Sequence, residues 1–270
     1  MIYDAIVIGG GPAGISAALT LRNRNKSVAV VANSPESTSL WKAEYINNYP
    51  GIKGTGAEIE KVMIDQAVDA GVEFLKGPAL SVIQIGNTFG VAVQNEYYES
   101  YSVIVCVGIT RESSYSGENE FIGKGVSYCA TCDGMLYKGK TVAVVGTNKE
   151  SEEDSKFLES IGCNVIKIAG TRKLEIIGEE KVSKIKYNNE EFNVDGVFII
   201  KDSISVSKLI NGLNYENKKI LVDEYGKTNI KGIFAAGDCT GKPLQLSKAV
   251  GEGNVAAISA NEYIENSKNM

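Results

Sequence analysis

The chain has 270 residues, of which 43% are hydrophobic and 23% charged, so it is long enough for one large or two ordinary globular domains. Its formal net charge of −5 argues against non-specific binding to nucleic acid, and no apolar run reaches the ~18 residues of a membrane span. Histidine is absent, which excludes Ser-His-Asp catalysis and any metal site that needs imidazole.

The first predicted elements form a strand–helix–strand unit. An apolar stretch over residues 2–8 predicts a buried parallel strand, a helix follows, and a second strand is expected over 27–32. Gly9, Gly11 and Gly14 lie between the first strand and the helix with the spacing G-x-G-x-x-G. Glycines at this spacing allow a tight turn, close approach of the backbone to a pyrophosphate and close packing of helix on strand. The turn is therefore predicted to bind a dinucleotide, and a plain tight turn is the alternative.

The residue after the second strand and the residues before the first strand bear on ribose binding and on localisation. An acidic residue usually binds the ribose at the end of the second strand. Asn33 stands there instead, and an amide can still hydrogen-bond a ribose hydroxyl. At the other end, the first strand follows the initiating methionine directly, without a basic segment or a cleavage site, so we expect a cytoplasmic protein.

The remaining segments alternate between helix and strand. We expect a helix over 57–71, strands near 72–76, 89–94 and 102–107, a strand–turn–helix unit from 140–146, strands over 162–170 and 195–200, a buried strand over 232–238 and a closing helix over 246–264. The late strand looks as if it returns to the first domain. We therefore predict an α/β fold of two nucleotide-binding-type, Rossmann-like three-layer domains, the second small and inserted into the first. The first domain would comprise residues 1–111 and 204–270, and the inserted domain residues 112–203.

The stretch GVSYCATCDG, residues 125–134, holds the only closely spaced cysteines, Cys129 and Cys132. Two intervening residues suit a small disulfide ring whose thiols can exchange with a partner disulfide. Asp133 follows directly and could hold or deliver a proton, provided that burial raises its pKa. A zinc site would need a second cysteine pair or histidine, so no metal is expected. Two buried structural thiols are the alternative.

The stretch VAVVGTNKESEED, residues 142–154, begins like a second dinucleotide site but lacks its later glycines. Its turn carries four carboxylates: Glu150, Glu152, Glu153 and Asp154. Two unit charges about 4 Å apart repel by about 4 kcal/mol at an effective dielectric constant of roughly 20, which disfavours a pyrophosphate there. Carboxylates also stabilise a helix N-terminus by ~0.3–1 kcal/mol each. Both interpretations predict no phosphate site in the inserted domain.

Taken together, these motifs resemble those of the low-molecular-weight thioredoxin reductases. The resemblance rests on GGGPAG, NNYPG, VIVCVG, GKGVSYCATCDG and GIFAAGDC, whose order and spacing cover most of the chain. It implies that the first domain binds FAD. The residues that would hold FAD are Gly9, Gly11, Pro12, Ala13 and Gly14 at the pyrophosphate, Asn33 and Leu40 along the adenosine and ribitol, Asn48 near the flavin ring, Gly108 at the adenosine end, Gly237 and Asp238 at the ribityl and phosphate region, and Gln245, Leu246 and Ala249 near the flavin.

The resemblance also implies roles for the cysteine pair. Cys132 would accept electrons from the flavin, Cys129 would attack the disulfide of thioredoxin, and Asp133 would be the acid–base residue. A homodimer is implied as well. Because the cysteines cannot touch both the flavin and a protein substrate in one pose, we expect hinges near residues 110–114 and 202–206.

All departures from the family pattern fall in the inserted domain. Residues 146–151 replace the family's second glycine motif, and Ala169-Gly170-Thr171 replaces the His-Arg-Arg that grips the 2′-phosphate of NADPH. In this respect the chain looks like the ferredoxin-linked flavin thioredoxin reductases, in which reduced ferredoxin passes single electrons to FAD. We therefore expect a flavin-dependent thioredoxin-disulfide reductase with ferredoxin as its electron donor.

Two other functions stay open at this point. The chain could use NADPH or NADH at a nucleotide site of unfamiliar form, since Arg172 and Lys173 stand nearby, or it could be a non-catalytic FAD-binding redox sensor. A docking patch for an acidic ferredoxin is expected to be basic, and residues 167–186 hold six Lys or Arg against three Glu. A mixed-charge solvated surface is the alternative interpretation of that segment.

Overall fold

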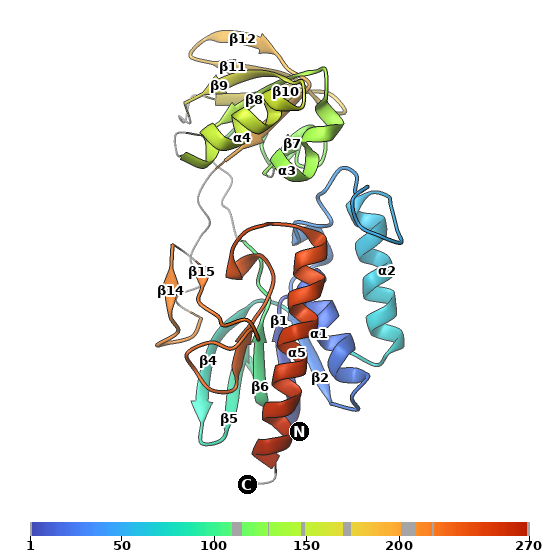
Figure 1. Cartoon of the computed structure of the whole chain (residues 1–270), viewed down its shortest axis with the longest axis vertical. Helices are drawn as coiled ribbons and strands as arrows, with labels where there is room; N and C mark the ends of the chain where they lie inside the picture. The colour runs from blue at the N-terminus through green and yellow to red at the C-terminus, as the bar shows by residue number, and fades with distance from the viewer. Residues whose placement is uncertain are drawn as a thin grey trace. The chain divides into compact units, whose positions relative to one another are not determined.

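The computed structural model describes most of the chain, as two compact units (Figure 1). The described residues are 2–109, 115–128, 130–146, 149–169, 174–200, 209–217 and 219–268. Unit 1 consists of Met1–Trp41, Ala57–Thr110 and Ile204–Met270, and unit 2 of Lys42–Gly56 and Arg111–Ser203. Residues 42–56, which the sequence analysis assigned to the first domain, cluster with unit 2. The hinges predicted near 110–114 and 202–206 lie outside the described residues.

Unit 1 is built on a seven-stranded mixed sheet. Its strands are β1 (Ile2–Ile8), β2 (Val28–Ala32), β3 (Glu73–Lys76), β4 (Ala79–Ile85), β5 (Thr88–Val93), β6 (Glu96–Val105) and β16 (Ile233–Ala235). The order along the sheet is β3-β2-β1-β6-β5-β4, and β16 also pairs with β6. The neighbouring strands β3, β2, β1 and β6 pair in parallel, and β16 pairs in parallel with β6. β5 pairs antiparallel with β6, and β4 pairs antiparallel with β5.

Strand β6 has partners along both of its edges. One edge pairs in parallel with β1 from Glu99 to Val105. The other edge pairs antiparallel with β5 over residues 96–100 and in parallel with β16 over residues 103–105. A strand that follows unit 2 in the sequence thus completes the sheet that the N-terminal strands begin.

Both faces of β1, of β2 and of the second half of β6 are buried, as their continuous apolar sequence requires. Side chains alternate across the sheet. Ala5 and Val7 of β1 belong to the core beneath the helices, whereas Ile6 and Ile8 belong to the core on the opposite face. That second core also holds apolar residues of the segment around the short hairpin β14 (Tyr215–Glu216) and β15 (Lys219–Ile220).

Helices α1 (Pro12–Arg22) and α5 (Leu246–Lys268) lie side by side on unit 1, and α2 (Gly56–Asp69) lies beyond them (Figure 1). Small residues permit the close approach of α1 to α5. A Cβ atom at Gly253 would lie 2.1 Å from the carbonyl oxygen of Ala13. Ser16 Oγ also donates a hydrogen bond of 2.7 Å to the carbonyl of Val250.

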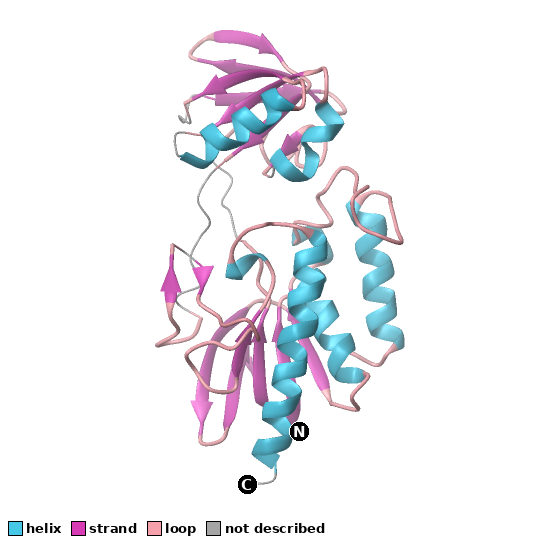
Figure 2. Cartoon of the chain, in the orientation of Figure 1, coloured by secondary structure: helices cyan, strands magenta, loops and turns pink. Residues whose placement is uncertain are grey.

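Unit 2 repeats the three-layer arrangement on a smaller scale (Figure 2). A parallel sheet in the order β7-β13-β8-β9 is covered on one face by the antiparallel sheet β10-β11-β12 and on the other by α3, η2 and α4. The bounds are β7 (Val126–Ser127), α3 (Ala130–Asp133), η2 (Gly134–Tyr137), β8 (Thr141–Val145), α4 (Lys149–Ser160), β9 (Asn164–Ile168), β10 (Leu174–Gly178), β11 (Val182–Tyr187), β12 (Glu190–Asn193) and β13 (Gly196–Ile199).

The predicted fold class is confirmed, because both units are α/β and layered around parallel strands. The predicted helices and strands of the parallel sheets lie within a few residues of the observed ones, except that β6 begins at Glu96, six residues before the predicted start at 102. The structure also contains elements that were not predicted: β4, β7, α3, the antiparallel sheet β10–β12 and the hairpin β14–β15. Two further short 3-10 turns are η1 (Pro35–Ser37) and η3 (Asp238–Thr240). None of the described helices is both long and apolar enough to cross a membrane.

Candidate active site

The first glycine turn has the shape that its spacing predicts. Gly9 has a φ of +117°, and a Cβ atom there would lie 2.1 Å from the carbonyl oxygen of Cys106. A Cβ atom at Gly14 would lie 1.9 Å from the carbonyl oxygen of Gly9. At Gly11, by contrast, no described atom lies within 4 Å of that position. Gly9 and Gly14 are therefore required by the fold, whereas Gly11 leaves one side of the backbone open to a ligand.

Helix α1 presents its N-terminus at this turn. Gly11 is the N-cap and provides no side-chain hydrogen bond, Pro12 occupies the first turn, and that turn holds no acidic residue. The first N–H groups of a helix have no partner within the helix, and the helix dipole favours an anion there. This turn fits the pyrophosphate of a dinucleotide without any rearrangement of charged side chains.

A second glycine turn lies against the first. Gly237, with a φ of +87°, follows β16, and a Cβ atom there would lie 2.8 Å from the Cβ of Ala13 and 4.0 Å from the Cβ of Ala249. Asp238 then begins η3. The structure thus brings together three regions that the sequence analysis assigned to one cofactor: the turn before α1, the Gly237–Asp238 turn and the start of α5.

The other predicted cofactor residues lie at the start of α5, after β6, after β2 and in segment 42–56. Leu246 is the first residue of α5, and Gln245 precedes it, its carbonyl accepting the N–H of Ala249 at 3.0 Å. Gly108 follows β6 with a φ of +64°. Asn33 is exposed after β2. Asn48 is exposed in segment 42–56 and belongs to unit 2.

Leu40 is buried in a turn that a carboxyl group of α2 holds. Glu60 is fully buried, and it accepts hydrogen bonds from the Thr38 hydroxyl and from the backbone of Trp41, on either side of Leu40. Burial raises the pKa of Glu60 to about 7. Its Oε1 atom has no partner among the residues that the structure describes. Glu60 is not part of any motif in the sequence.

The corresponding turn of unit 2 begins at Gly146, and its residues 147 and 148 lie outside the described residues. A Cβ atom at Gly146 would lie 2.8 Å from both the carbonyl oxygen of Ile200 and the Cβ of Ser151. Ser151 is buried in the first turn of α4, whereas Glu152 and Glu153 are exposed there. Ser151 thus stands at the spacing that Gly14 has in the first turn, where a Cβ atom would not fit, and the solvent side of the helix start is acidic.

The redox motif lies at the short helix α3. Cys129 lies outside the described residues, and Cys132 belongs to α3 with its side chain outside the described part. Asp133 ends this helix. Its Oδ2 atom accepts a 2.6 Å hydrogen bond from Ser127 Oγ, while its Oδ1 atom is buried without a partner among the described residues. Burial raises the pKa of Asp133 to about 6, against the opposing effect of Ser127.

Two tyrosine–carboxylate pairs flank this motif. Tyr128, just before Cys129, donates a 2.6 Å hydrogen bond to the fully buried Glu118. Tyr137, at the end of η2, donates a 2.9 Å hydrogen bond to Glu44, and burial raises its pKa above its usual value. The sequence analysis named none of these four residues, because each partner lies beyond the reach of a local spacing pattern.

The predicted basic segment 167–186 is partly paired. Lys167 forms an ion pair of 3.1 Å with Glu159, and Lys184 forms one of 2.8 Å with Glu191. Arg172 and Lys173 lie outside the described residues. The described part of this segment is thus a surface of mixed charge, which was the alternative interpretation.

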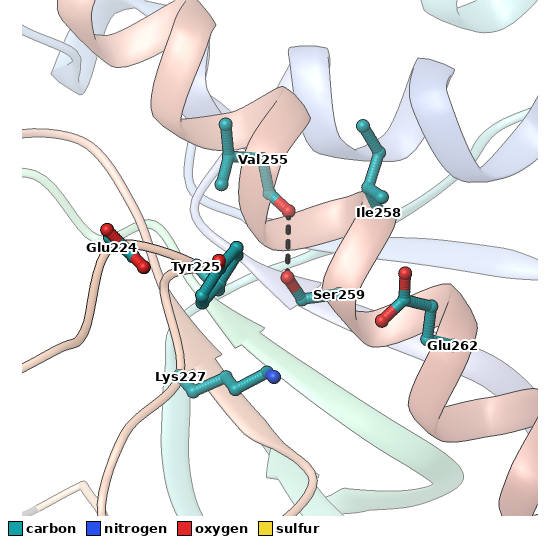
Figure 3. A pocket seen from close by; sticks show the side chains of 7 residues that line it. All are labelled: Glu224, Tyr225, Lys227, Val255, Ile258, Ser259 and Glu262. Atoms are coloured by element: carbon teal, nitrogen blue, oxygen red, sulfur yellow. Dashed lines mark hydrogen bonds between the residues drawn. The ribbon is translucent and has the colours of Figure 1, made fainter.

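A separate hollow of about 540 Å³ lies on unit 1 (Figure 3). Its lining residues are Glu224, Tyr225, Lys227, Val255, Ile258, Ser259 and Glu262. Ser259 Oγ donates to the carbonyl of Val255 within α5, at 3.2 Å. None of the predicted cofactor or redox residues lines this hollow, so it does not form part of the candidate site.

Comparison with known proteins gives consistent matches over nearly the whole chain. The family model for pyridine nucleotide-disulphide oxidoreductases matches residues 3–175 and 160–253. The thioredoxin reductase of Bacillus subtilis is 30% identical over 301 residues, which covers 98% of this chain and 95% of that protein.

Solved structures agree with this result. A thioredoxin reductase from Streptococcus pyogenes has a TM-score of 0.88 and 27% identity, covering 98% of this chain and 99% of that one. A ferredoxin-flavin thioredoxin reductase from Clostridium acetobutylicum is 39% identical, covers 100% of both chains and has a TM-score of 0.64.

Proposed function

Because the chain belongs to the pyridine nucleotide-disulphide oxidoreductase family, we propose that it is a flavin-dependent thioredoxin reductase that takes its electrons from reduced ferredoxin. Flavin disulfide oxidoreductase chemistry follows from membership of the family, and FAD is its cofactor.

The contrast between two helix N-termini carries the choice of donor. The start of α1 has an open glycine turn and no acidic residue in its first turn. The start of α4 has Ser151 packed at Gly146, with Glu152 and Glu153 exposed. The phosphates of a nicotinamide dinucleotide would meet the negative charge of these carboxylates there. We therefore propose that unit 2 carries the redox motif without binding NADPH.

The relatives support the same choice. Identity is 39% to the ferredoxin-flavin thioredoxin reductase of Clostridium acetobutylicum, over the full length of both chains. It is 30% to the thioredoxin reductase of Bacillus subtilis. Of these two proteins, the ferredoxin-flavin thioredoxin reductase is thus the one with the higher sequence identity to this chain.

The proposed chemistry divides between the two units. When bound, FAD supplies the means of converting single electrons into the pair that a disulfide needs. Gly9, Gly11 and Gly14 would hold its pyrophosphate at the start of α1. In unit 2, Cys132 is proposed as the flavin-side cysteine and Cys129 as the nucleophile toward thioredoxin.

Asp133 is proposed to hold and deliver the proton that accompanies thiol exchange. Its Oδ1 atom is buried without a partner among the described residues, and its pKa of about 6 keeps part of the carboxyl protonated near neutral pH. Ser127 orients the group through its 2.6 Å hydrogen bond to Oδ2.

An anaerobic absorbance titration of the FAD-loaded protein tests the donor. Reduced ferredoxin is expected to bleach the flavin band at about 450 nm, whereas excess NADPH or NADH is expected to leave it unchanged. The Cys129→Ser variant is the matched control. It should still be bleached by ferredoxin but should no longer reduce thioredoxin.

The same titration distinguishes the alternatives. Rapid bleaching by NADPH would replace ferredoxin with a nicotinamide and would mean that unit 2 binds nucleotide in an unfamiliar way. A wild-type protein that is bleached but does not reduce thioredoxin would instead favour the redox sensor. We also propose a cytoplasmic homodimer, as the sequence analysis expects, and sedimentation velocity of the full chain tests the dimer.

A further inference from the structure

The Gly237–Gly241 turn is held by side chains of α5. Gly237 and Gly241 have φ values of +87° and +115°, a region that glycine adopts at little cost. A turn bounded by two such glycines has many accessible conformations unless other groups fix it. Its position against Ala13 places it beside the pyrophosphate turn.

Lys248 fixes the carbonyl side of this turn. Its Nζ atom donates to the carbonyl of Gly237 at 2.8 Å, to the carbonyl of Gly241 at 2.6 Å and to Thr240 Oγ1 at 3.0 Å. An ammonium group has three protons to donate, so these acceptors use all of them. The Lys248 side chain is only 15% exposed.

Glu252, one helical turn further along α5, fixes the N–H side. Its Oε2 atom accepts the N–H of Gly237 at 2.9 Å and lies 2.8 Å from Thr240 Oγ1. It also forms a 3.1 Å ion pair with Lys248. Both backbone groups of Gly237 are thus bound by two oppositely charged side chains of one helix.

We propose that Lys248 and Glu252 are positioning residues that shape the Gly237–Gly241 turn to receive FAD. The inference rests on the proposed function, because it concerns the FAD of that enzyme. Lys248 also pairs with Glu252 at 3.1 Å, and it would offset the repulsion between that carboxylate and the phosphates of a bound cofactor. The two residues therefore act as a unit, and removal of the cation alone is the most damaging change.

The dissociation constant of FAD from the full-length holoprotein tests this proposal. FAD release is followed by the increase in flavin fluorescence. Lys248→Met is expected to raise the constant by about tenfold or more, since hydrogen bonds from a charged donor are lost and Glu252 is left unpaired. Lys248→Arg keeps the charge beside Glu252 but not the geometry of the ammonium, so it is expected to raise the constant less than Lys248→Met does. Lys231→Met, exposed just before β16, is the matched control and is expected to have no effect.

The double variant Lys248→Met/Glu252→Gln separates positioning from a general structural role. It is expected to bind FAD more tightly than Lys248→Met alone, because it removes the unpaired carboxylate. A merely structural role predicts that the double variant is the weaker of the two, and that result would overturn the inference. If Lys248→Met does not fold, Lys248→Gln takes its place, and wild-type affinity in that variant would overturn the inference as well.

The two proposals can fail separately. A wild-type protein that binds no FAD would overturn the proposed function, and this inference with it. A wild-type protein that holds FAD, together with a Lys248→Met variant that holds it equally well, would overturn the inference alone.

Discussion

Glu60 and Asp133 are buried carboxyl groups whose pKa values lie above the ordinary range, at about 7 and about 6. In both cases burial is the main cause, and a hydroxyl group, of Thr38 or Ser127, opposes it. Each group also has one oxygen without a partner among the described residues. These similar environments serve different ends, because Glu60 braces a turn of unit 1 whereas Asp133 adjoins the redox motif.

Glu60 is expected to make unit 1 less stable as pH rises. Between its unfolded pKa of 4.5 and its folded pKa of about 7, the folded state holds a proton that the unfolded state has lost. The contribution of Glu60 to the free energy of unfolding is thus greatest below pH 4.5, and it falls by about 2–3 kcal/mol between pH 5 and pH 8. Urea unfolding of Glu60→Gln is expected to lack that decrease.

Glu58→Gln is the matched control, since Glu58 is exposed in the same helix two residues away. It should keep the pH dependence of the wild type. An equal decrease in wild type and Glu60→Gln would show that Glu60 is ionised in the folded protein at both pH values.

Asp133 is expected to set the pH dependence of thioredoxin reduction. Below a pH of about 6 the carboxyl is protonated and can donate, so the rate of disulfide reduction should fall as pH rises through that value. Asp133→Asn should abolish this inflection and lower the rate by roughly 10²–10⁴-fold. Stopped-flow measurement across the pH range gives both quantities.

Ser127→Ala provides a directional check on the same group. The Ser127 hydroxyl stabilises the ionised carboxylate, so its removal should move the inflection to higher pH. An inflection that stays in place, or one that moves to lower pH, would contradict the assignment to Asp133.

Cys106, Cys163 and Cys239 are buried free thiols, and burial raises the pKa of each, to about 12 for Cys239. Since the thiolate is the reactive form, they should resist alkylation in the reduced native protein. Mass spectrometry after brief iodoacetamide treatment is expected to find these three unlabelled in buffer and labelled in urea. Rapid native labelling of Cys239 would contradict its burial beside β6.

Some residues of the site could be predicted from the sequence because their reason is local. Gly9 and Gly14 are fixed by contacts within one turn, which the spacing reveals directly. Glu60 and Tyr137 bind partners 22 and 93 residues away, so no local pattern identifies them. The same holds for Lys248 and Glu252, whose spacing is also that of an ordinary helical ion pair.

At the scale of elements, strands with continuous apolar sequence were predictable and amphipathic ones were not. β1 and β8 are buried on both faces, and their sequences are almost wholly apolar. β10 and β11 alternate buried with exposed or half-buried positions over five and six residues, and the four residues of β12 include no buried one. Such short alternation is hard to distinguish from a polar loop.

The glycines at the start of α1 give a matched pair of substitutions. Gly14→Ala would place a Cβ atom 1.9 Å from a backbone oxygen, so it should destabilise the protein by about 3 kcal/mol or more. Gly11→Ala meets no atom within 4 Å, so it should change stability by less than about 1 kcal/mol while weakening FAD binding by about tenfold or more. Urea unfolding and flavin release measure the two effects, and equal losses of stability would contradict this division.

At the scale of the whole molecule, the two nucleotide-type units should respond differently to ligands. A ligand that binds only the folded state stabilises it by about 2.7 kcal/mol at a concentration 100 times its dissociation constant. Added FAD should therefore raise the melting temperature, and NADPH should not. Calorimetry of the full chain with each ligand checks this, and protection by NADPH would point to a nucleotide site in unit 2.

The pairing of β6 has a consequence for how the chain is made. Residues 103–105 receive their second partner only from β16, after residues 111–203 have already left the ribosome. The sheet β7-β13-β8-β9 of unit 2 can thus form while β6 of unit 1 still has an unpaired edge. At that stage α5 has not yet been made. Assembly of the flavin site is then a late event, because Gly237, Lys248 and Glu252 are among the last residues synthesised. A nascent chain arrested before residue 233 would display an open apolar edge, and chaperones are expected to recognise it.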